Sequence, residues 1–184
     1  MTLLLTVLTG LIYPGVVTGL CQLLFPNQAN GSLLTRNGKI VGSALIGQNF
    51  TTPQYFQPRP SAAGNDGYDA SASSGSNFGP TNQKLMDRVK SSVQKIKADN
   101  GESLAALPAD IATASGSGLD PHISPASAKL QVARVAKARG AGAEQITQLV
   151  DRFTEERDLG FLGEARVNVL LLNLALDEKF PMVR

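Results

Sequence analysis

The chain has 184 residues, which corresponds to one domain with a short appended segment. Its 17 basic and 15 acidic residues leave a formal charge of +2, and this balance excludes the strongly basic surface of a nucleic-acid-binding protein. A single cysteine, Cys21, excludes an intrachain disulfide. A single histidine, His122, excludes a metal site built from several histidines.

The N-terminal segment is apolar throughout, and no charged side chain precedes Arg36. As an α-helix, residues 1–25 would extend about 37 Å, which exceeds the roughly 30 Å of a bilayer's hydrocarbon core. The segment lacks a basic start and an A-x-A cleavage site, so it differs from a cleaved signal peptide. The sequence therefore predicts a single retained transmembrane helix over residues 1–25.

Two features of this helix bear on its contacts and its orientation. Gly15 and Gly19 fit the small-xxx-small spacing that lets membrane helices pack closely, although glycines can take this spacing by chance. Arg36 and Lys39 are the nearest charges, and a literal positive-inside count places them in the cytoplasm. The count is weak because the chain begins almost inside the bilayer, so charge leaves the orientation open.

The segment after the helix has the signals of a short hairpin and a long loop. Apolar residues in 32–46 flank Asn37 and Gly38, a typical two-residue hairpin turn, and predict two short strands. Serine and glycine dominate residues 63–79, which predicts an irregular loop.

Helical periodicity is clear further along the chain. We expect a helix over 80–98 with Thr81 as N-cap, and a second over 125–139 capped by Ser124. Residues 145–153 predict a third helix. The apolar run 167–176 favours a fourth, although its first residues would also suit a buried strand. The predicted fold is an α+β domain, residues 26–184, behind the helix at 1–25.

One short segment invites a catalytic interpretation, because Ser117, Asp120 and His122 lie within a few positions. A catalytic triad takes its members from separate parts of a fold, and Ser117 stands directly between two glycines instead of in a G-x-S-x-G elbow. The residues instead favour a turn in which Asp120 or Ser124 caps a helix. The chain has no G-x-x-x-x-G-K-[ST] phosphate loop, no dinucleotide-binding fingerprint and no calcium-loop spacing.

Five motifs in one order resemble the KdpC family, whose members belong to the bacterial Kdp potassium-transporting P-type ATPase. They are GSALIGQ at 42–48, YFQPRPSA at 55–62, SNFGPTN at 76–82, ASGSGLDPHIS at 114–124, and LGFLGE at 159–164 leading into RVNVL. With the exit motif LFP at 24–26, the resemblance spans nearly the whole chain. It departs from the family at two points, a missing basic N-terminal tail and Ala165 in place of proline.

The resemblance implies an accessory subunit that is not catalytic by itself. It implies a single-pass protein of the plasma (inner) membrane whose soluble domain is extracytoplasmic. The implied partners are a channel-like potassium-binding subunit (KdpA), a P-type ATP-hydrolysing subunit (KdpB) and a small single-span subunit (KdpF), besides membrane lipid. ATP as a ligand is implied only by the resemblance, since the family is described as a catalytic chaperone that raises the ATP affinity of the hydrolysing subunit.

The candidate site residues are therefore those of a partner interface. On the soluble domain we expect docking through Arg59, the pair Tyr55 and Phe56, and residues 118–124 with Asp120 and His122, because tyrosine, phenylalanine and arginine are enriched at such contacts. Core packing is an equal alternative for the two aromatic residues. Gly15 and Gly19 are the candidates in the helix. The rival functions are a membrane-anchored serine hydrolase using Ser117 and His122, and a nucleotide-binding module.

Overall fold

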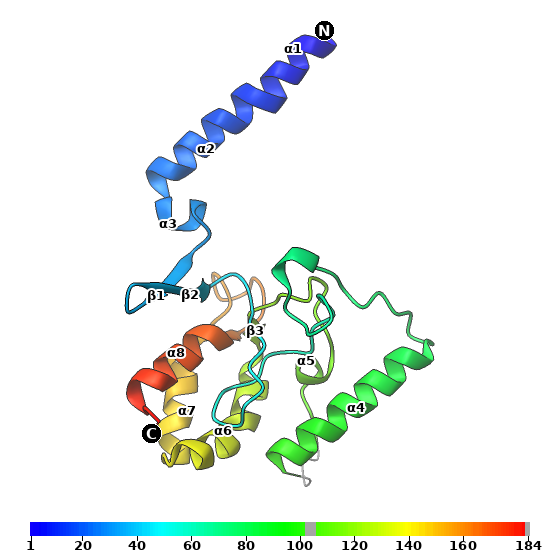
Figure 1. The fold of residues 1–184 in the computed structure, drawn as a ribbon, viewed down its shortest axis with the longest axis vertical. Helices are drawn as coiled ribbons and strands as arrows, with labels where there is room; N and C mark the ends of the chain where they lie inside the picture. The colour runs from blue at the N-terminus through cyan, green and yellow to red at the C-terminus, as the bar shows by residue number, and fades with distance from the viewer. Residues whose placement is uncertain (102–105, 183–184) are drawn as a thin grey trace. The chain divides into compact units, whose positions relative to one another are not determined.

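The computed structural model describes residues 1–101 and 106–182, and the chain divides into two compact units (Figure 1). The first unit is Met1–Leu45 and the second is Ile46–Arg184. Helices and sheets are both present, which confirms the predicted mixture of α and β structure.

The first unit begins with a continuous helix built from three consecutive elements. They are α1 (Thr2–Val7), the π-helical turn η1 (Leu8–Ile12) and α2 (Tyr13–Leu24). Pro14 has no N–H to donate to the preceding turn, and the wider π turn lies directly before it. The residues Thr2–Leu24 are long and apolar enough to cross a membrane. This agrees with the helix that the sequence predicts over residues 1–25.

A β-hairpin follows the short helix α3 (Pro26–Ala29), as the sequence predicts. Strand β1 (Leu33–Arg36) pairs antiparallel with β2 (Lys39–Ser43), with Arg36 opposite Lys39. Asn37 and Gly38 both have positive φ, 52° and 74°, as a tight two-residue hairpin turn requires. A register shift between Leu34 and Thr35 bends the ribbon.

The second unit contains the predicted helices with small changes at their ends. Helix α4 is Gln83–Asn100, α6 is Pro125–Arg139 and α7 is Ala143–Arg152. Ser124 caps α6 through a bond from the Ser127 N–H, as predicted. The prediction of Thr81 as the cap of α4 is wrong. The Asn82 side chain accepts from the Lys84 N–H instead, because the helix starts later than expected.

The terminal apolar run combines both structures that its sequence suggests. Residues Arg166–Asn168 form strand β5, and helix α8 then runs over Val169–Lys179. The prediction of a helix over the whole run is therefore wrong at its start. Asn168 explains the change, because its side chain accepts from the Leu171 N–H and so caps a helix that begins only after it.

Strand β5 is the centre of a small antiparallel sheet with the order β3-β5-β4. Strand β3 (His122–Ile123) lies on one side of it and β4 (Thr154–Glu155) on the other. The pairing of His122 with Asn168 places the 118–124 turn beside the start of α8. The other elements in the described part of this unit are the helical turn η2 (Ala70–Ala72) and the short helix α5 (Ala109–Ala112).

The main core lies between helices α6, α7 and α8 and the sheet. Its fully buried side chains include Phe56, Val135, Ile146, Val167 and Leu172. A second, smaller cluster joins α4 and α5 to α6. Its members are Ile96, Ile111 and Ala112, with Val89, Val93, Leu107 and Leu130 packed against them. Helix α6 contributes residues to both clusters and so lies between α4 and α5 on one side and α7 and α8 on the other (Figure 1).

Candidate partner interface

Three of the predicted site residues form one polar cluster. The Arg59 Nη1 donates to Asp120 Oδ2 at 2.8 Å, and the other oxygen of Asp120 accepts from the His122 backbone N–H at 2.9 Å. The His122 Nδ1 lies 3.5 Å from the same oxygen. All three side chains are partly exposed. The structure therefore brings Arg59 to the 118–124 turn from a segment that is distant in the sequence.

The environment of Asp120 keeps its carboxylate charged. Partial burial raises the pKa of Asp120, but hydrogen bonds from His122 and Arg59 and the charge of Arg59 together lower that pKa below its ordinary value. Asp120 is therefore an anion at neutral pH, and the cluster presents a cation and an anion side by side.

Two side chains hold the loop at 61–68 against the turn. The Ser61 hydroxyl donates to the Gly118 carbonyl at 2.6 Å and accepts from the N–H groups of Ala63 and Tyr68. The Tyr68 hydroxyl donates to the Arg59 carbonyl at 2.8 Å, and burial raises the pKa of this phenol. These bonds hold the backbone at Arg59 and just after it, and so help to fix where its guanidinium lies.

Gly118 occupies a position that accepts no side chain. Its φ is +68°, and a Cβ there would lie 2.7 Å from the Ser74 carbonyl oxygen and 2.8 Å from the Ala63 Cβ. We expect Gly118→Ala to lower the free energy of unfolding by about 2–4 kcal/mol, from the left-handed backbone and the overpacking together. Chemical denaturation of the full-length chain in detergent measures this.

Gly116 offers a matched control for that experiment. It lies two residues earlier in the same turn, outside the left-handed region, and among the described residues nothing lies within 4 Å of a Cβ built there. Gly116→Ala should leave stability nearly unchanged. Equal losses for the two variants would contradict the assigned role of Gly118.

An extended segment before Arg59 is held by amide side chains instead of by a sheet. The buried Asn173 accepts from the Phe56 N–H and donates to the Phe56 carbonyl, both at 2.9 Å. The buried Gln131 does the same for Gln57, at 2.7 Å and 3.1 Å. Each amide replaces a neighbouring strand and satisfies both polar groups of one residue.

Two arginines of α6 complete this support. Arg134 donates to the carbonyls of Pro53 and Tyr55, and Arg139 donates to the Gln54 carbonyl at 2.9 Å. The Arg139 side chain is fully buried and pairs with Asp177 at 2.8 Å, and its guanidinium carbon lies 4.7 Å from the centre of the Tyr55 ring. The Tyr55 hydroxyl donates to the second oxygen of Asp177 at 3.1 Å.

The predicted interface residues therefore fall into different environments. Phe56 has no exposed surface and packs in the main core, which is the alternative that the sequence left open for it. Tyr55 is half-buried against Arg139. Gly15 and Gly19 lie on α2, where the described residues leave the space around each Cα open. Of the residues predicted for the interface, Arg59, Asp120 and His122 bring their polar atoms together at the surface of the second unit.

These three residues line a groove with a second set of charges. The groove has a volume of about 740 Å³. Its lining includes Arg59, Asp120 and His122, together with Arg157 and Glu164 from the connection between β4 and β5 and Arg166 at the start of β5. Asp110 lies at the same groove, where its carboxylate accepts from the Ser124 N–H at 2.7 Å and from the hydroxyls of Ser124 and Ser127. The groove is thus lined by charges of both signs.

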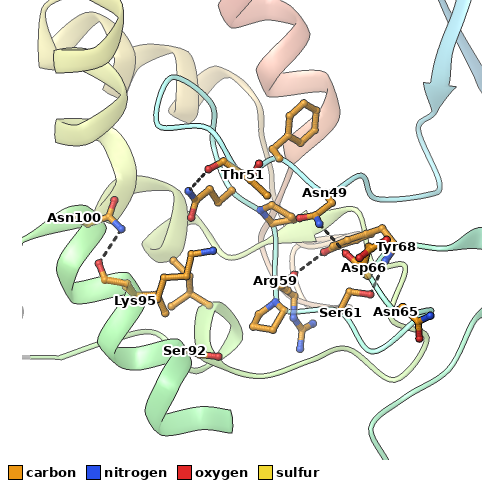
Figure 2. Close-up of a pocket in the computed structure, with 17 residues that line it drawn as sticks. Asn49, Thr51, Arg59, Ser61, Asn65, Asp66, Tyr68, Ser92, Lys95 and Asn100 are labelled. Carbon is orange, nitrogen blue, oxygen red and sulfur yellow. Dashed lines mark hydrogen bonds between the residues drawn. The ribbon is translucent and has the colours of Figure 1, made fainter.

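A smaller cavity of about 290 Å³ lies on another face of Arg59 (Figure 2). Figure 2 shows Asn49, Asp66 and Tyr68 on one side of it and Lys95 and Asn100 of α4 on the other. Its two cations, Arg59 and Lys95, come from an extended segment and the middle of a helix. This differs from the phosphate-binding arrangement, in which backbone N–H groups of a glycine-rich loop lead into a helix. The nucleotide-binding alternative is therefore not supported.

The hydrolase alternative has no geometric support either. The Ser117 hydroxyl accepts from the Leu119 N–H at 3.1 Å, and within the described part of the chain no hydrogen bond joins it to His122. A nucleophile needs a base within hydrogen-bond reach.

Among residues 1–101 and 106–182 no group of three His, Cys, Asp or Glu side chains could hold a metal ion.

The helix and the polar cluster together define a class of protein. Among the described residues, it has one apolar helix that is long enough to cross a membrane and a mixed α/β unit with a partly exposed polar cluster. The family model described as KdpC, K⁺-transporting ATPase, c chain, matches residues 1–178. The chain belongs to this family.

Individual relatives agree with the family model along the whole chain. A potassium-transporting ATPase KdpC subunit from Gemmatimonas aurantiaca is 63% identical over 177 residues, covering 96% of this chain and 88% of the relative. Proteins with the same description from Rhodospirillum rubrum and Koribacter versatilis are 58% and 57% identical. They are matched over 97% and 99% of this chain and 92% and 93% of their own lengths. The predicted family resemblance is confirmed.

Proposed function

We propose that this chain is the non-catalytic KdpC subunit of a Kdp potassium-transporting ATPase complex. The match of residues 1–178 to the KdpC family, with identities of 57–63% to relatives described as potassium-transporting ATPase subunits, supports this proposal most directly. The partners are the channel-like potassium-binding subunit KdpA, the P-type ATP-hydrolysing subunit KdpB and the small single-span subunit KdpF.

The apolar N-terminal helix provides the membrane anchor in this proposal. It crosses the plasma (inner) membrane once, and the open surface at Gly15 and Gly19 lets a neighbouring helix of the complex approach closely. The second unit then lies on the extracytoplasmic side. Protease added outside sealed right-side-out vesicles should digest the second unit and leave the helix, and full protection would reverse the orientation.

The contribution of this subunit to ATP use is indirect in this proposal. A domain outside the cytoplasm does not contact cytoplasmic ATP, and the two cavities that Arg59 lines lack a phosphate-binding loop. Contacts that stabilise the transport-competent state of the partner subunits raise the ATP affinity of KdpB through a free-energy linkage between distant sites.

The groove containing Arg59, Asp120 and His122 is the proposed docking surface of the soluble domain. A partly exposed arginine that is already oriented by Asp120 and by the Thr113 carbonyl loses little conformational freedom on binding. We expect Arg59→Ala to weaken association with the complex about ten-fold or more, since arginine is enriched at dominant interface contacts. Quantitative co-purification from membranes that express all four subunits measures this.

Lys129 offers a matched control on the same domain. It forms an exposed ion pair with Asp151 at 2.9 Å and is not among the residues that line the groove. Lys129→Ala should co-purify like the wild type. Undiminished association of the Arg59→Ala chain would remove Arg59 from the interface, and thermal unfolding of both variants separates lost binding from lost folding.

A further inference from the structure

The connection between β4 and β5 exposes large apolar side chains at its tip. Leu159 is 83% exposed, Phe161 69% and Leu162 49%. In a soluble domain, neighbouring exposed side chains of this size usually mark a contact site. Met86 and Phe78 are exposed too, but they lie on different elements and do not adjoin such a set.

This tip is ordered by its own backbone. The Asp158 N–H donates to the Leu162 carbonyl and the Leu162 N–H donates to the Asp158 carbonyl, both at 2.9 Å. The Gly160 N–H donates to the Arg157 carbonyl at 3.0 Å. Leu159 is held at φ +54°, a conformation that a bulky residue rarely adopts. The backbone that carries the apolar side chains is therefore ordered, at a cost in backbone strain.

Exposed ion pairs lie at the base of the same connection. Arg157 pairs with Glu164 at 2.7 Å, and Arg166 pairs with Glu155 at 2.9 Å. Arg157, Glu164 and Arg166 also line the groove that contains Arg59. The apolar tip is thus continuous with the proposed docking surface, and a partner seated in the groove would reach both.

The charge around the tip distinguishes between two possible binding partners, a membrane surface and a pocket on another protein. Residues 155–166 contain two arginines and four acidic residues, so the segment is net negative. Anionic lipid headgroups repel such a segment, because membrane-binding loops rely on basic residues. A protein pocket with an apolar floor and a basic rim complements both its apolar and its charged parts.

We propose that the tip formed by Leu159, Phe161 and Leu162 is an anchor that inserts into an apolar, basic-rimmed pocket on another subunit of the ATPase complex. This inference rests on the proposed function. Phe161 is the central contact, because an aromatic side chain presented in a fixed position buries a large area with little loss of conformational entropy. Arg157 and Glu164, which flank the tip in the sequence, line the groove and so place the tip beside it.

Photo-cross-linking in membranes that contain the full complex tests the anchor. The photoreactive residue p-benzoylphenylalanine replaces Phe161 in one sample and the exposed Met86 of α4 in the other. We expect irradiation to join position 161 to one of the three other subunits, identified by mass, while position 86 gives at most a weak product. A lipid adduct at 161, equal products at both positions, or no product in an assembled complex would overturn the inference.

A substitution series provides the second measurement. Phe161→Ser should reduce the amount of complex that co-purifies with the chain about ten-fold, while thermal unfolding of the chain stays unchanged because the side chain lies outside the core. Met86→Ser is the control and should assemble normally. Normal assembly of Phe161→Ser overturns the anchor alone, whereas failure of the wild-type chain to co-purify with any ATPase subunit overturns the proposed function and the anchor with it.

Discussion

Arg139→Met is expected to destabilise the domain by about 3–5 kcal/mol, because it removes one partner of a buried ion pair. The guanidinium is fully buried and donates to Asp177 and to the carbonyls of Gln54 and Phe180. Its loss leaves these acceptors with one donor fewer and takes the cation away from the Tyr55 ring. The midpoint of thermal unfolding of the full-length chain should fall by roughly 10 °C or more.

The exposed pair of Lys129 and Asp151 is the control for that experiment. Both side chains are more than half exposed, so Lys129→Met should change stability by no more than about 0.5 kcal/mol. A similar midpoint for Arg139→Met and the wild type would show that the buried pair does not hold α6 and α8 to the 53–57 segment.

Asn173→Leu is expected to lower stability by about 2–4 kcal/mol, although leucine has a similar size. Asn173 satisfies both the N–H and the carbonyl of Phe56 in the core, and leucine leaves both without that partner. Hydrogen exchange at the Phe56 amide gives a local readout. This amide should exchange slowly in the wild type and much faster in the variant.

Asn65→Leu makes the same chemical change in an exposed position. Its stability and the exchange rate at Phe56 should match the wild type. If Asn173→Leu proved as stable as the wild type, or if the Phe56 amide stayed protected in it, the amide would not be what positions the segment before Arg59.

Local patterns were sufficient to predict the main helices and the hairpin. Ser124 before Pro125 sets the start of α6, and Gly140 with φ +64° ends it. Asn37 and Gly38 set the hairpin turn, because few other residues adopt two successive positive φ angles. Each of these signals acts within a few residues, so the sequence displays it directly.

Contacts between distant segments could not be predicted in the same way. Strands β3 and β4 have two residues each, too few for an alternating pattern, and β5 precedes α8 without a break. Asn173 and Gln131 look like polar interruptions of apolar helix faces, and their partners are 117 and 74 positions away. The only sign in the sequence that these side chains hold the 56–57 segment was a polar residue within the buried face of each helix.

The candidate interface was predicted in part by composition. Arg59, Asp120 and His122 meet at one groove, although no spacing rule relates residue 59 to residue 120. Phe56 was grouped with them because aromatic residues are common at interfaces, but burial in the core explains its presence equally well in a sequence. The sequence of residues 159–162 does not show that their side chains are exposed, and only the exposure of Leu159, Phe161 and Leu162 in the structure indicates a contact site.

Potassium-stimulated ATP hydrolysis by the partner subunits, measured with and without this chain, tests the central claim most directly. KdpA, KdpB and KdpF purified from cells that lack the chain should hydrolyse ATP weakly and with low ATP affinity. Adding the full-length chain should restore a stable complex of all four proteins and raise its ATP affinity, while the chain alone hydrolyses no ATP. Unchanged hydrolysis and ATP affinity in the absence of the chain would contradict its assignment as a working part of the pump.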